Sequence, residues 1–233
     1  MTVVFQPPAA ALVPTTDGRE FPVHRIYCVG RNYAAHAREM GFDPDREPPF
    51  FFCKPNDDAS IVPVSAGKAA SIPYPGQTAN YHYEAELVVL IGKGGRDISV
   101  DDAVNHIYGY AVGLDMTRRD LQNDMKKQGR PWCIGKAFEQ SAPIGPVVPA
   151  AKAGDVANAE ISLQVNGTDR QRSTVSKLIW NIGETIEHLS TAWELQPGDL
   201  IFTGTPEGVA AVVAGDTLVG GVTGVGELRI RIA

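Results

Sequence analysis

One apolar stretch, Tyr81–Gly92, constrains the fold of this chain more than any other segment. It reads YHYEAELVVLIG, so polar and apolar residues alternate before five consecutive apolar residues and a closing glycine. Such a run predicts a β-strand that becomes buried, because short apolar runs bounded by a turn residue are typical of core strands. We therefore expect this strand to lie at the centre of the fold.

Two acidic residues precede the apolar run, at positions that share one face of the predicted strand. Side chains alternate between the faces of a β-strand, so Glu84 and Glu86 point to the same side. Two carboxylates this close repel each other unless a proton or a cation lies between them. Alternatively, both are solvated glutamates at the start of a strand, since glutamate is mostly exposed in folded proteins.

A third carboxylate, Asp115, follows the next strand-like segment, Tyr108–Leu114. At the end of a buried strand, Asp115 could complete a three-carboxylate site with Glu84 and Glu86. Oxygen ligands without His or Cys favour Mg²⁺ or Mn²⁺ over Zn²⁺, and Ca²⁺ accepts the same ligands, for instance in a crystal. The spacing alone leaves a metal site and an ordinary pair of strand ends both open.

Composition and charge argue against several classes of function. The chain has 233 residues, of which 43 % are hydrophobic and 21 % charged, as is typical of a globular protein. The net charge of −6 and the lack of long basic clusters argue against nucleic acid as a partner. No segment has the ~20 apolar residues of a membrane span, and the first residues lack a signal-peptide pattern. We therefore expect a cytoplasmic protein that binds no membrane.

The three cysteines, Cys28, Cys53 and Cys133, are odd in number and form no CxxC motif. We expect them to be reduced thiols, which agrees with a cytoplasmic protein. Ordinary packing explains them better than a catalytic role, although a nucleophilic cysteine stays an alternative.

The chain is expected to form an N-terminal arm over residues 1–20 and a single domain over residues 21–233. Repeated short strands with glycine turns in the tail are typical of an antiparallel barrel or roll. The predicted helices and turn are a short helix at Tyr33–Met40 with Asn32 as N-cap, a helix at Arg118–Gln128, a hairpin turn at Asn166-Gly167 and a long helix at Thr174–Trp193. The predicted strands include Phe21–Gly30, Phe50–Lys54, Asp199–Thr203, Thr217–Val219 and Glu227–Ile232.

Several polar residues allow both a structural and a chemical interpretation. His36 and Glu39 lie three residues apart on the short helix, either as a surface pair or as an imidazole that a carboxylate polarises to activate water. Flanking glycines would let the helix near residues 32–41 act as a mobile lid. Lys136 is either a surface lysine or a cation for substrate oxygens. The turn around Thr205 is either an ordinary turn or an anion site.

Five motifs, taken together, resemble one enzyme family. The chain lacks GxSxG, HExxH and a P-loop, but it contains GRNYAAHAREMG, YHYEAELVVLIGKG, YGYAVGLDMTRRDLQ, GKAF and TGTPEGV in that order. This order is similar to the fumarylacetoacetate hydrolase family, in its short single-domain members, from about Val23 to the C-terminus. The resemblance implies an α+β fold with a mixed β-roll or barrel core, a few flanking helices and a homodimer.

The resemblance also implies roles for particular residues of this chain. The implied metal ligands are Glu84, Glu86 and Asp115, for Mg²⁺ or Mn²⁺. The implied catalytic residues are His36, Glu39 and Lys136, and the implied substrate-binding residues are Arg119, Gln122 and Thr205. His82, on the same strand face as Glu84, is expected to support the metal ligands.

The implied reaction is metal-dependent hydrolysis of a carbon–carbon bond in a 2,4-dioxo acid, a small anionic substrate. His36 would deprotonate the attacking water, while the metal and Lys136 would stabilise the departing pyruvate enolate. The segments FPVHRIYCVGRNYAAHAREMG and PPFFFCK favour the subgroup that hydrolyses fumarylpyruvate to fumarate and pyruvate in aromatic-acid breakdown. Two alternatives stay open: an acylpyruvase or oxaloacetate decarboxylase on the same metal site, and a catalytically silent member that binds dioxo acids without turnover.

Overall fold

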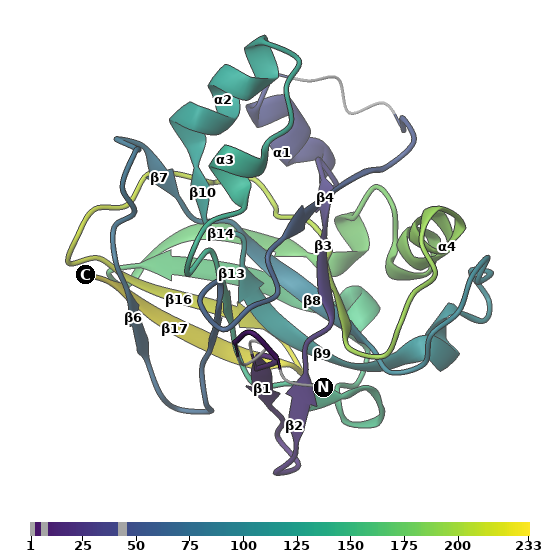
Figure 1. Ribbon diagram of the computed structural model, residues 1–233. Coiled ribbons are helices and arrows are strands. Elements are labelled where there is room, and N and C mark those ends of the chain that lie inside the picture. The colour runs from purple at the N-terminus through teal and green to yellow at the C-terminus, as the bar shows by residue number, and fades with distance from the viewer. Residues whose placement is uncertain (1–2, 6–8, 42–45) are drawn as a thin grey trace.

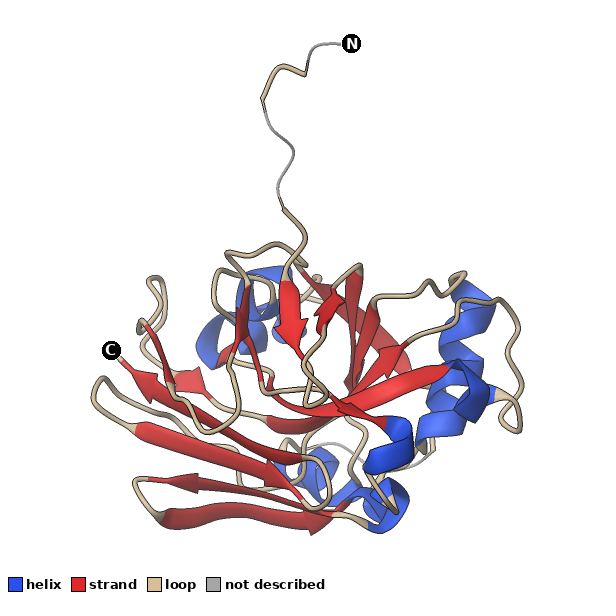
Figure 2. Ribbon diagram, turned by 90° about the horizontal axis from the view of Figure 1, so that it is seen from below, coloured by secondary structure: helices blue, strands red, loops and turns tan. Residues whose placement is uncertain are grey.

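The computed structural model describes residues 3–5, 9–41 and 46–233, and within these ranges it contains two main β-sheets (Figures 1 and 2). The larger sheet has the strand order β4 (Phe50–Lys54), β3 (Arg25–Gly30), β15 (Asp199–Phe202), β8 (Ala85–Ile91), β9 (Ile107–Leu114), β11 (Ala142–Ile144) and β5 (Ile61–Pro63), with β12 (Val148–Pro149) also on β9. The second sheet has the order β14 (Thr168–Thr174), β13 (Glu160–Val165), β16 (Thr217–Val222), β17 (Gly226–Ile232) and β6 (Ala70–Ile72). Two short pairs are β1 (Leu12–Pro14) with β2 (Glu20–Pro22), and β7 (Tyr81–His82) with β10 (Thr117–Arg118).

Helices are few and mostly short in the described ranges. The α-helices are α1 (Ala34–Glu39), α2 (Arg119–Lys127), α3 (Cys133–Lys136) and α4 (Ile182–Ala192). The 3₁₀ helices are η1 (Ala103–His106), η2 (Ala150–Lys152), η3 (Val156–Asn158) and η4 (Val175–Lys177). Figure 1 shows α1, α2 and α3 gathered at one end of the molecule, while α4 lies apart from them. Among the described helices, none has the length and apolar character needed to cross a membrane.

Strand β8 is the centre of the larger sheet because both of its faces are buried. It pairs antiparallel with β15 on one side and with β9 on the other. Leu87 and Val89 pack in a core shared with the second sheet, while Val88 and Leu90 pack in a separate core on the opposite face. Every residue of β8 is buried. This explains the unbroken apolar run in the sequence, since a strand covered on both faces needs no polar side.

The α+β class with mixed sheets is confirmed. Both sheets combine antiparallel and parallel pairs, because β15 pairs parallel with β3 and β17 pairs parallel with β6. The strands of the tail do not form one antiparallel unit: β15 joins the larger sheet, whereas β16 and β17 join the second. The glycine turns mark where these strands end, but they do not specify which partner each strand takes.

Several local predictions are confirmed by the backbone. The predicted strand Phe50–Lys54 coincides with β4, and α2 lies within one residue of the predicted bounds at each end. Asn166 and Gly167 join β13 to β14 with φ values of 51° and 77°. Positive φ at both central residues is what a two-residue hairpin turn requires, and asparagine and glycine adopt it readily.

The long helix predicted at Thr174–Trp193 is wrong over its first part. The chain forms η4 and then an irregular segment, and α4 begins after Asn181. Asn181 caps the helix, since its side chain accepts from the Glu184 amide at 3.0 Å and Glu184 accepts from the Asn181 amide at 3.0 Å. Before the cap, the Ile179 amide donates to the Asn32 carbonyl at 2.8 Å. This tertiary hydrogen bond holds the backbone away from the helix that the apolar period predicts.

The N-cap predicted for the short helix is also wrong. Tyr33 occupies the N-cap position of α1 and makes no side-chain cap. The Asn32 amide group instead donates to the Thr203 and Trp180 carbonyls at 2.8 and 3.0 Å, and its oxygen accepts from the Trp180 amide at 2.8 Å. Asn32 therefore joins the start of the helix to two distant segments.

The first residues lie partly inside and partly outside the described ranges. Residues 1–2 and 6–8 of the expected arm are outside them. Within the expected arm, Leu12–Pro14 pairs with Glu20–Pro22 as the hairpin β1–β2. Val13 and Phe21 of this hairpin are buried against the apolar face that β8 presents through Val88 and Leu90.

Candidate metal centre and active site

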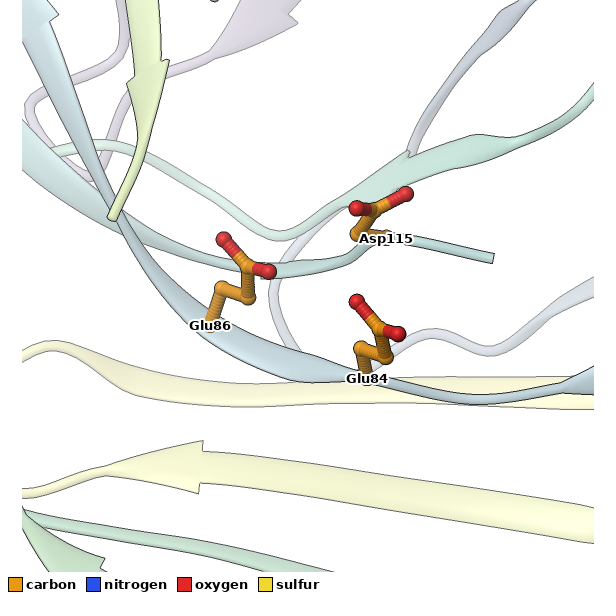
Figure 3. A group of neighbouring side chains, drawn as sticks. All are labelled: Glu84, Glu86 and Asp115. Carbon is orange, nitrogen blue, oxygen red and sulfur yellow. The ribbon is translucent and has the colours of Figure 1, made fainter. Parts of the chain in front are cut away.

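The pairing of β8 with β9 brings three carboxylates together. Ala85 lies opposite Leu114 in this ladder, so Glu84 and Asp115 face each other at its end, and the Asp115 amide donates to the Glu84 carbonyl at 2.9 Å. Glu86 points to the same side as Glu84, toward Asp115 (Figure 3). One oxygen from each carboxylate lies within 4.8 Å of the others, and all three residues are buried. The alternative that Glu84 and Glu86 are solvated at the start of a strand is therefore excluded.

The three carboxylates differ in how their charge is compensated. Burial, followed by the neighbouring Asp115 and Glu84 charges, raises the pKa of Glu86 well above its ordinary value. Burial also acts to raise the pKa of Glu84, but Lys136 and Arg119 outweigh it and hold that pKa below the ordinary value. Without a further cation, Glu86 is thus the member of the group that favours the protonated form.

Lys136 lies against two of these carboxylates. Its Nζ donates to Glu84 Oε2 at 2.7 Å, to Asp115 Oδ2 at 2.6 Å and to Thr117 Oγ1 at 2.8 Å. Burial acts to lower the pKa of Lys136, but Asp115 and Glu84 outweigh it, so the pKa is raised and the ammonium stays charged. Lys136 is 2 % exposed, which excludes a surface lysine.

A second buried lysine, Lys54, is absent from the set predicted from the sequence. Its Nζ lies 2.8 Å from Asp115 Oδ1, and it donates to the Met116 carbonyl at 3.3 Å and to the Lys136 carbonyl. Lys54 ends strand β4, directly after an apolar run. A lysine directly after an apolar run indicates a buried ion pair. Its partner, however, lies 61 residues away, so the spacing of residues in the sequence does not identify it.

The first turn of α2 places Arg119 and Gln122 beside the carboxylates. Arg119 donates to Glu84 Oε1 and, at 2.6 Å, to Gln122 Oε1. Its Nε lies 3.4 Å from Nδ1 of His82, whose Nε2 is 2.8 Å from Asn80 Oδ1. Burial and the Arg119 charge lower the pKa of His82 to about 4, so this imidazole is neutral. His82 is therefore linked to Glu84 indirectly, because Arg119 contacts both side chains.

The turn after β15 presents hydrogen-bond donors to the same group. The Gly204 amide donates to Glu86 Oε2 at 2.8 Å. Thr205 Oγ1 donates to the Ala85 carbonyl at 2.8 Å and accepts from Gln171 Nε2 at 2.9 Å. The amide of this turn thus binds the Glu86 carboxyl group of the chain itself, while the Thr205 hydroxyl is bonded to the backbone.

His36 and Glu39 form a pair at the end of α1. His36 Nδ1 lies 3.2 Å from Glu39 Oε2, and the Gly208 amide donates to Glu39 Oε1 at 3.1 Å. The hydrogen bond from His36 is the main cause that lowers the pKa of Glu39, so this carboxylate is ionised. His36 is 7 % exposed, which excludes a purely solvated pair. With Nδ1 held by Glu39, Nε2 is the nitrogen that can accept a proton.

One pocket gathers eight of the nine predicted site residues. Its lining includes Glu84, Glu86, Asp115, His36, Arg119, Gln122, Lys136 and Thr205. The ninth residue, Glu39, reaches the pocket through its bond to His36. The free volume is about 30 Å³, which is close to the space of one water molecule. The lining also contains Arg31, Lys126 and Trp132, which the sequence-based set lacks.

A larger cavity of about 770 Å³ lies elsewhere, between η1, η3 and the start of α4. Its lining is mainly apolar and includes Val104, Tyr110 and Ile182. Within the described residues, Asp155 is its one charged lining residue. The smaller polar pocket is therefore the candidate active site, because it combines carboxylates, cations and an imidazole.

The carboxylate group fits a hard divalent cation. It consists of Glu84, Glu86 and Asp115, which all offer oxygen. Mg²⁺ and Mn²⁺ prefer such ligands, whereas Zn²⁺ prefers nitrogen and sulfur. A divalent cation would also favour the ionised form of Glu86, whose pKa burial and the neighbouring carboxylates raise. The three oxygens can therefore hold Mg²⁺ or Mn²⁺.

Comparison with known proteins identifies a family and its members. The family model described as "Fumarylacetoacetate (FAA) hydrolase C-terminal" matches residues 25–233. A fumarylpyruvate hydrolase from a Ralstonia species is 49 % identical over 190 residues, which are 82 % of this chain and 95 % of that protein. A mitochondrial oxaloacetate tautomerase from Arabidopsis thaliana is 39 % identical over 208 residues, 89 % of this chain and 90 % of that protein.

A solved structure shares the whole fold. It is the crystal structure of fumarylpyruvate hydrolase from Pseudomonas aeruginosa in complex with Mn²⁺ and pyruvate. The two chains are 58 % identical and superimpose with a TM-score of 0.96, covering 100 % of this chain and 99 % of that one.

Proposed function

The chain belongs to the fumarylacetoacetate hydrolase family, and on this premise we propose that it is a metal-dependent hydrolase that cleaves a carbon–carbon bond in fumarylpyruvate, a 2,4-dioxo acid. The products are fumarate and pyruvate. Two fumarylpyruvate hydrolases that are 49 % and 58 % identical to this chain support the assignment. The observation that carries it is the pocket in which three buried carboxylates, the Lys136 ammonium and the His36 imidazole meet.

The proposed cofactor is Mg²⁺ or Mn²⁺, held by Glu84, Glu86 and Asp115. The Pseudomonas aeruginosa relative contains Mn²⁺, and the all-oxygen group described here accepts either ion. When bound, the ion supplies Lewis-acid stabilisation of negative charge on substrate oxygens. Lys136 and Arg119 add fixed positive charge beside it, and we propose that this charge stabilises the oxygens of the pyruvate half, with Gln122 and Thr205 as further polar partners.

His36 is the proposed general base. Glu39 accepts a hydrogen bond from Nδ1–H, fixes the tautomer and leaves Nε2 to take a proton from water. The oxygen of that water attacks the carbonyl carbon next to the fumaryl double bond. The carbon–carbon bond then breaks, and its electron pair moves to the pyruvate half as an enolate. Protonation of the enolate carbon, balanced by the proton that His36 received, gives pyruvate, while the acyl half leaves as fumarate.

Helix α1, near residues 32–41, is the proposed lid. The free volume of the pocket, about 30 Å³, is small for a dioxo acid, and we propose that α1 moves to admit the substrate. His36 of α1 and Met40, its C-cap residue, line the pocket, and Glu39 contacts Gly208 on the facing turn. Opening of α1 would break that contact and give access to the carboxylates.

The test is turnover of fumarylpyruvate, acetylpyruvate and oxaloacetate side by side, with Mn²⁺, with Mg²⁺ and with EDTA. We expect fumarylpyruvate to be hydrolysed fastest and EDTA to abolish its hydrolysis. Oxaloacetate is included because of the 39 % identity to an oxaloacetate tautomerase. If oxaloacetate alone were consumed, by decarboxylation or tautomerisation, the hydrolase assignment would be overturned while the metal site would stand.

We further propose that the protein acts as a homodimer in the cytoplasm, in the breakdown of aromatic acids. The family resemblance supports the dimer, as do the exposed side chains of Val100 and Val104 at the apolar cavity. Cys28, Cys53 and Cys133 are unpaired, in keeping with a reducing compartment. Light scattering of the purified chain would give a mass near 50 kDa, twice the 25.0 kDa of one chain; a mass of one chain would exclude the dimer.

A further inference from the structure

Gln171 belongs to the second sheet, but its side chain bonds to segments of the active site. It lies on β14 and is 1 % exposed. The Ala85 amide donates to Gln171 Oε1 at 3.0 Å, and Gln171 Nε2 donates to Thr205 Oγ1 at 2.9 Å and to the Pro206 carbonyl at 2.8 Å. A backbone amide only donates and a carbonyl only accepts, so these partners fix the orientation of the side-chain amide. The proposed reaction gives Gln171 no part, although all of these bonds end beside the pocket.

An extra residue in β14 turns Gln171 toward the larger sheet. Leu163 of β13 lies opposite Gln171, whereas the next residue, Gln164, lies opposite Asp169, so Arg170 is the extra residue. Residues directly opposite in a ladder share a face, and Leu163 packs in the core that the two sheets share. In a regular ladder Arg170 would lie opposite Leu163, and its charge would face this core. The β-bulge therefore places a glutamine there, as bulges beside active sites often re-aim a side chain.

Gln171 and Thr205 continue the ladder of β8 beyond the end of β15. The pairing of β15 with β8 stops before it reaches Ala85. At that position Gln171 Oε1 accepts from the Ala85 amide, and Thr205 Oγ1 donates to the Ala85 carbonyl at 2.8 Å. Two side chains thus satisfy buried backbone groups that would otherwise need a further strand residue. Because Ala85 lies between Glu84 and Glu86, the turn is tied to the strand segment of the proposed metal ligands.

These bonds also fix the direction of the Thr205 hydroxyl. A hydroxyl has one hydrogen and two lone pairs. The hydrogen goes to the Ala85 carbonyl, and one lone pair accepts from Gln171 Nε2. One lone pair is left, on a side chain that lines the pocket. Gln171 therefore sets both the place and the orientation of this polar group.

The bulge packs against the far end of the same turn as well. Gly208 has a φ of 95°, and a Cβ there would lie 2.1 Å from the Arg170 carbonyl oxygen. The absence of a side chain is what lets the two backbones approach this closely. The Gly208 amide donates to Glu39, and the Gly208 carbonyl accepts from the Tyr83 hydroxyl at 3.0 Å. Residues 170–171 thus support the turn at both of its ends.

We propose that Gln171 is a positioning residue of the active site, which holds the turn at Thr205 and Pro206 against β8 and so keeps the Thr205 hydroxyl where substrate binds. This inference rests on the proposed function, in which Thr205 is a polar partner of the pyruvate half. Gln171 acts through Thr205, because among the described residues that line the pocket Thr205 is present and Gln171 is not.

The test is a double-mutant cycle of Gln171→Met and Thr205→Val, measured as the Kd of pyruvate for the Mn²⁺-loaded protein by calorimetry. Pyruvate is the probe because it is a product of the proposed reaction and its binding needs no turnover. We expect each single variant to raise this Kd about 10-fold, as for one lost hydrogen bond. The double variant should raise it no further, since both changes remove the same contact. KM for fumarylpyruvate should rise by a similar factor, with a smaller change in kcat.

Ser173→Ala is the matched control. Ser173 lies two residues further along β14, on the same face, and it is buried. Within the described part of the chain, its hydroxyl has no hydrogen-bond partner. This variant should leave the Kd of pyruvate and the KM unchanged. An equal rise in Kd for Ser173→Ala would mean a general packing effect and would overturn the positioning role.

The double variant gives the decisive outcome. If its Kd rose about 100-fold, the two effects would be independent and Gln171 would not act through Thr205. Gln171→Glu replaces Gln171→Met in the cycle if the methionine variant does not fold, because it keeps the length and the acceptor for the Ala85 amide but loses the amide donors. If the unaltered protein bound pyruvate but hydrolysed no fumarylpyruvate, the proposed function would be wrong, while the cycle on pyruvate would still decide the role of Gln171.

Discussion

In this pocket, one buried carboxylate can contact more than one buried cation. Asp115 Oδ1 and Oδ2 lie 2.8 Å from Lys54 Nζ and 2.6 Å from Lys136 Nζ, so one carboxylate touches two ammonium groups. Among the described residues, none forms a salt bridge with Glu86, which takes an amide hydrogen from Gly204 instead. This asymmetry is why burial and its acidic neighbours raise the pKa of Glu86, whereas Lys136 and Arg119 hold the pKa of Glu84 down.

The first prediction concerns proton release when metal binds. Because burial and the neighbouring carboxylates raise the pKa of Glu86 in the protein without metal, a divalent cation competes with a proton for this group. Affinity for Mn²⁺ should therefore rise with pH until Glu86 is ionised in the free protein. Calorimetric titrations in buffers of different ionisation enthalpy would measure the protons released. Glu86→Gln should bind Mn²⁺ weakly and release fewer protons; equal release from this variant would contradict the assignment.

The second prediction separates the roles of His36 and Glu39. His36→Gln removes the proposed base and should lower kcat on fumarylpyruvate about 10²- to 10⁴-fold. Glu39→Gln keeps a hydrogen-bond acceptor for Nδ1 but loses the charge, so we expect a smaller loss of about 10-fold to 100-fold. Steady-state kinetics with Mn²⁺ would give both values. Full activity of His36→Gln would exclude it as the base, and unchanged Mn²⁺ affinity in both variants is the control.

At the scale of elements, helix α1 depends on contacts outside itself. It has six residues and no side-chain N-cap. A helix this short is unstable alone, because nucleation is not offset by enough intrahelical bonds. Its start is held by Asn32, whose side chain makes three hydrogen bonds to the segments at Trp180 and Thr203. Its end is held by the bond from Gly208 to Glu39.

The third prediction tests this anchoring of α1. Asn32→Ala removes three side-chain hydrogen bonds and should lower the free energy of unfolding by roughly 3 kcal/mol, at about 1 kcal/mol per bond. It should also raise KM for fumarylpyruvate, since the start of the proposed lid is released. Urea denaturation and steady-state kinetics would measure the two effects.

Asn181→Ala is the matched control for this anchoring. Asn181 caps α4 through its bond from Glu184, so its loss should lower the free energy of unfolding by about 1 kcal/mol. KM should stay as in the unaltered enzyme, because α4 does not line the pocket. If both variants changed KM alike, the effect would be one of general stability and not of the lid.

At the scale of the whole molecule, the site lies where the two central strands end. Strands β8 and β9 are covered by a core on each face, and the carboxylates follow at the end of their shared ladder. Lys54, Arg119 and Lys136 then come from β4, α2 and α3. The site therefore forms when these distant elements are assembled, so ligand binding at the site should stabilise the complete fold.

The fourth prediction follows from this coupling. A ligand at 100 times its Kd stabilises the native state by about 2.7 kcal/mol. For a chain of this size that corresponds to a rise in Tm of roughly 5–10 °C with Mn²⁺, at about 2–4 °C per kcal/mol. Scanning calorimetry with Mn²⁺ and with EDTA would measure it. Asp115→Asn should lose most of the shift; an equal shift in this variant would place the stabilising ion elsewhere.

The sequence predicts features that depend on neighbouring residues or on a shared motif. The alternation before Val88 places Glu84 and Glu86 on one face, and Asn166-Gly167 requires a tight turn. These features follow from strand geometry and turn conformation, which act over a few residues. The sequence also places Asp115 at the end of a strand that turns out to pair with β8.

The tertiary structure decides which distant residues share the pocket. The contacts of Lys54 with Asp115 and of Asn32 with Trp180 join segments that no local period relates. Asn32 also delays the start of the helix predicted at Thr174–Trp193, because the hydrogen bond from the Ile179 amide to the Asn32 carbonyl outweighs a weak helical preference. The sequence by itself therefore determined, through local geometry, that Glu84 and Glu86 share one face and that the apolar run after them forms the central strand. The fold decided the partners of their charges, because burial and ion pairing depend on segments that only folding brings together.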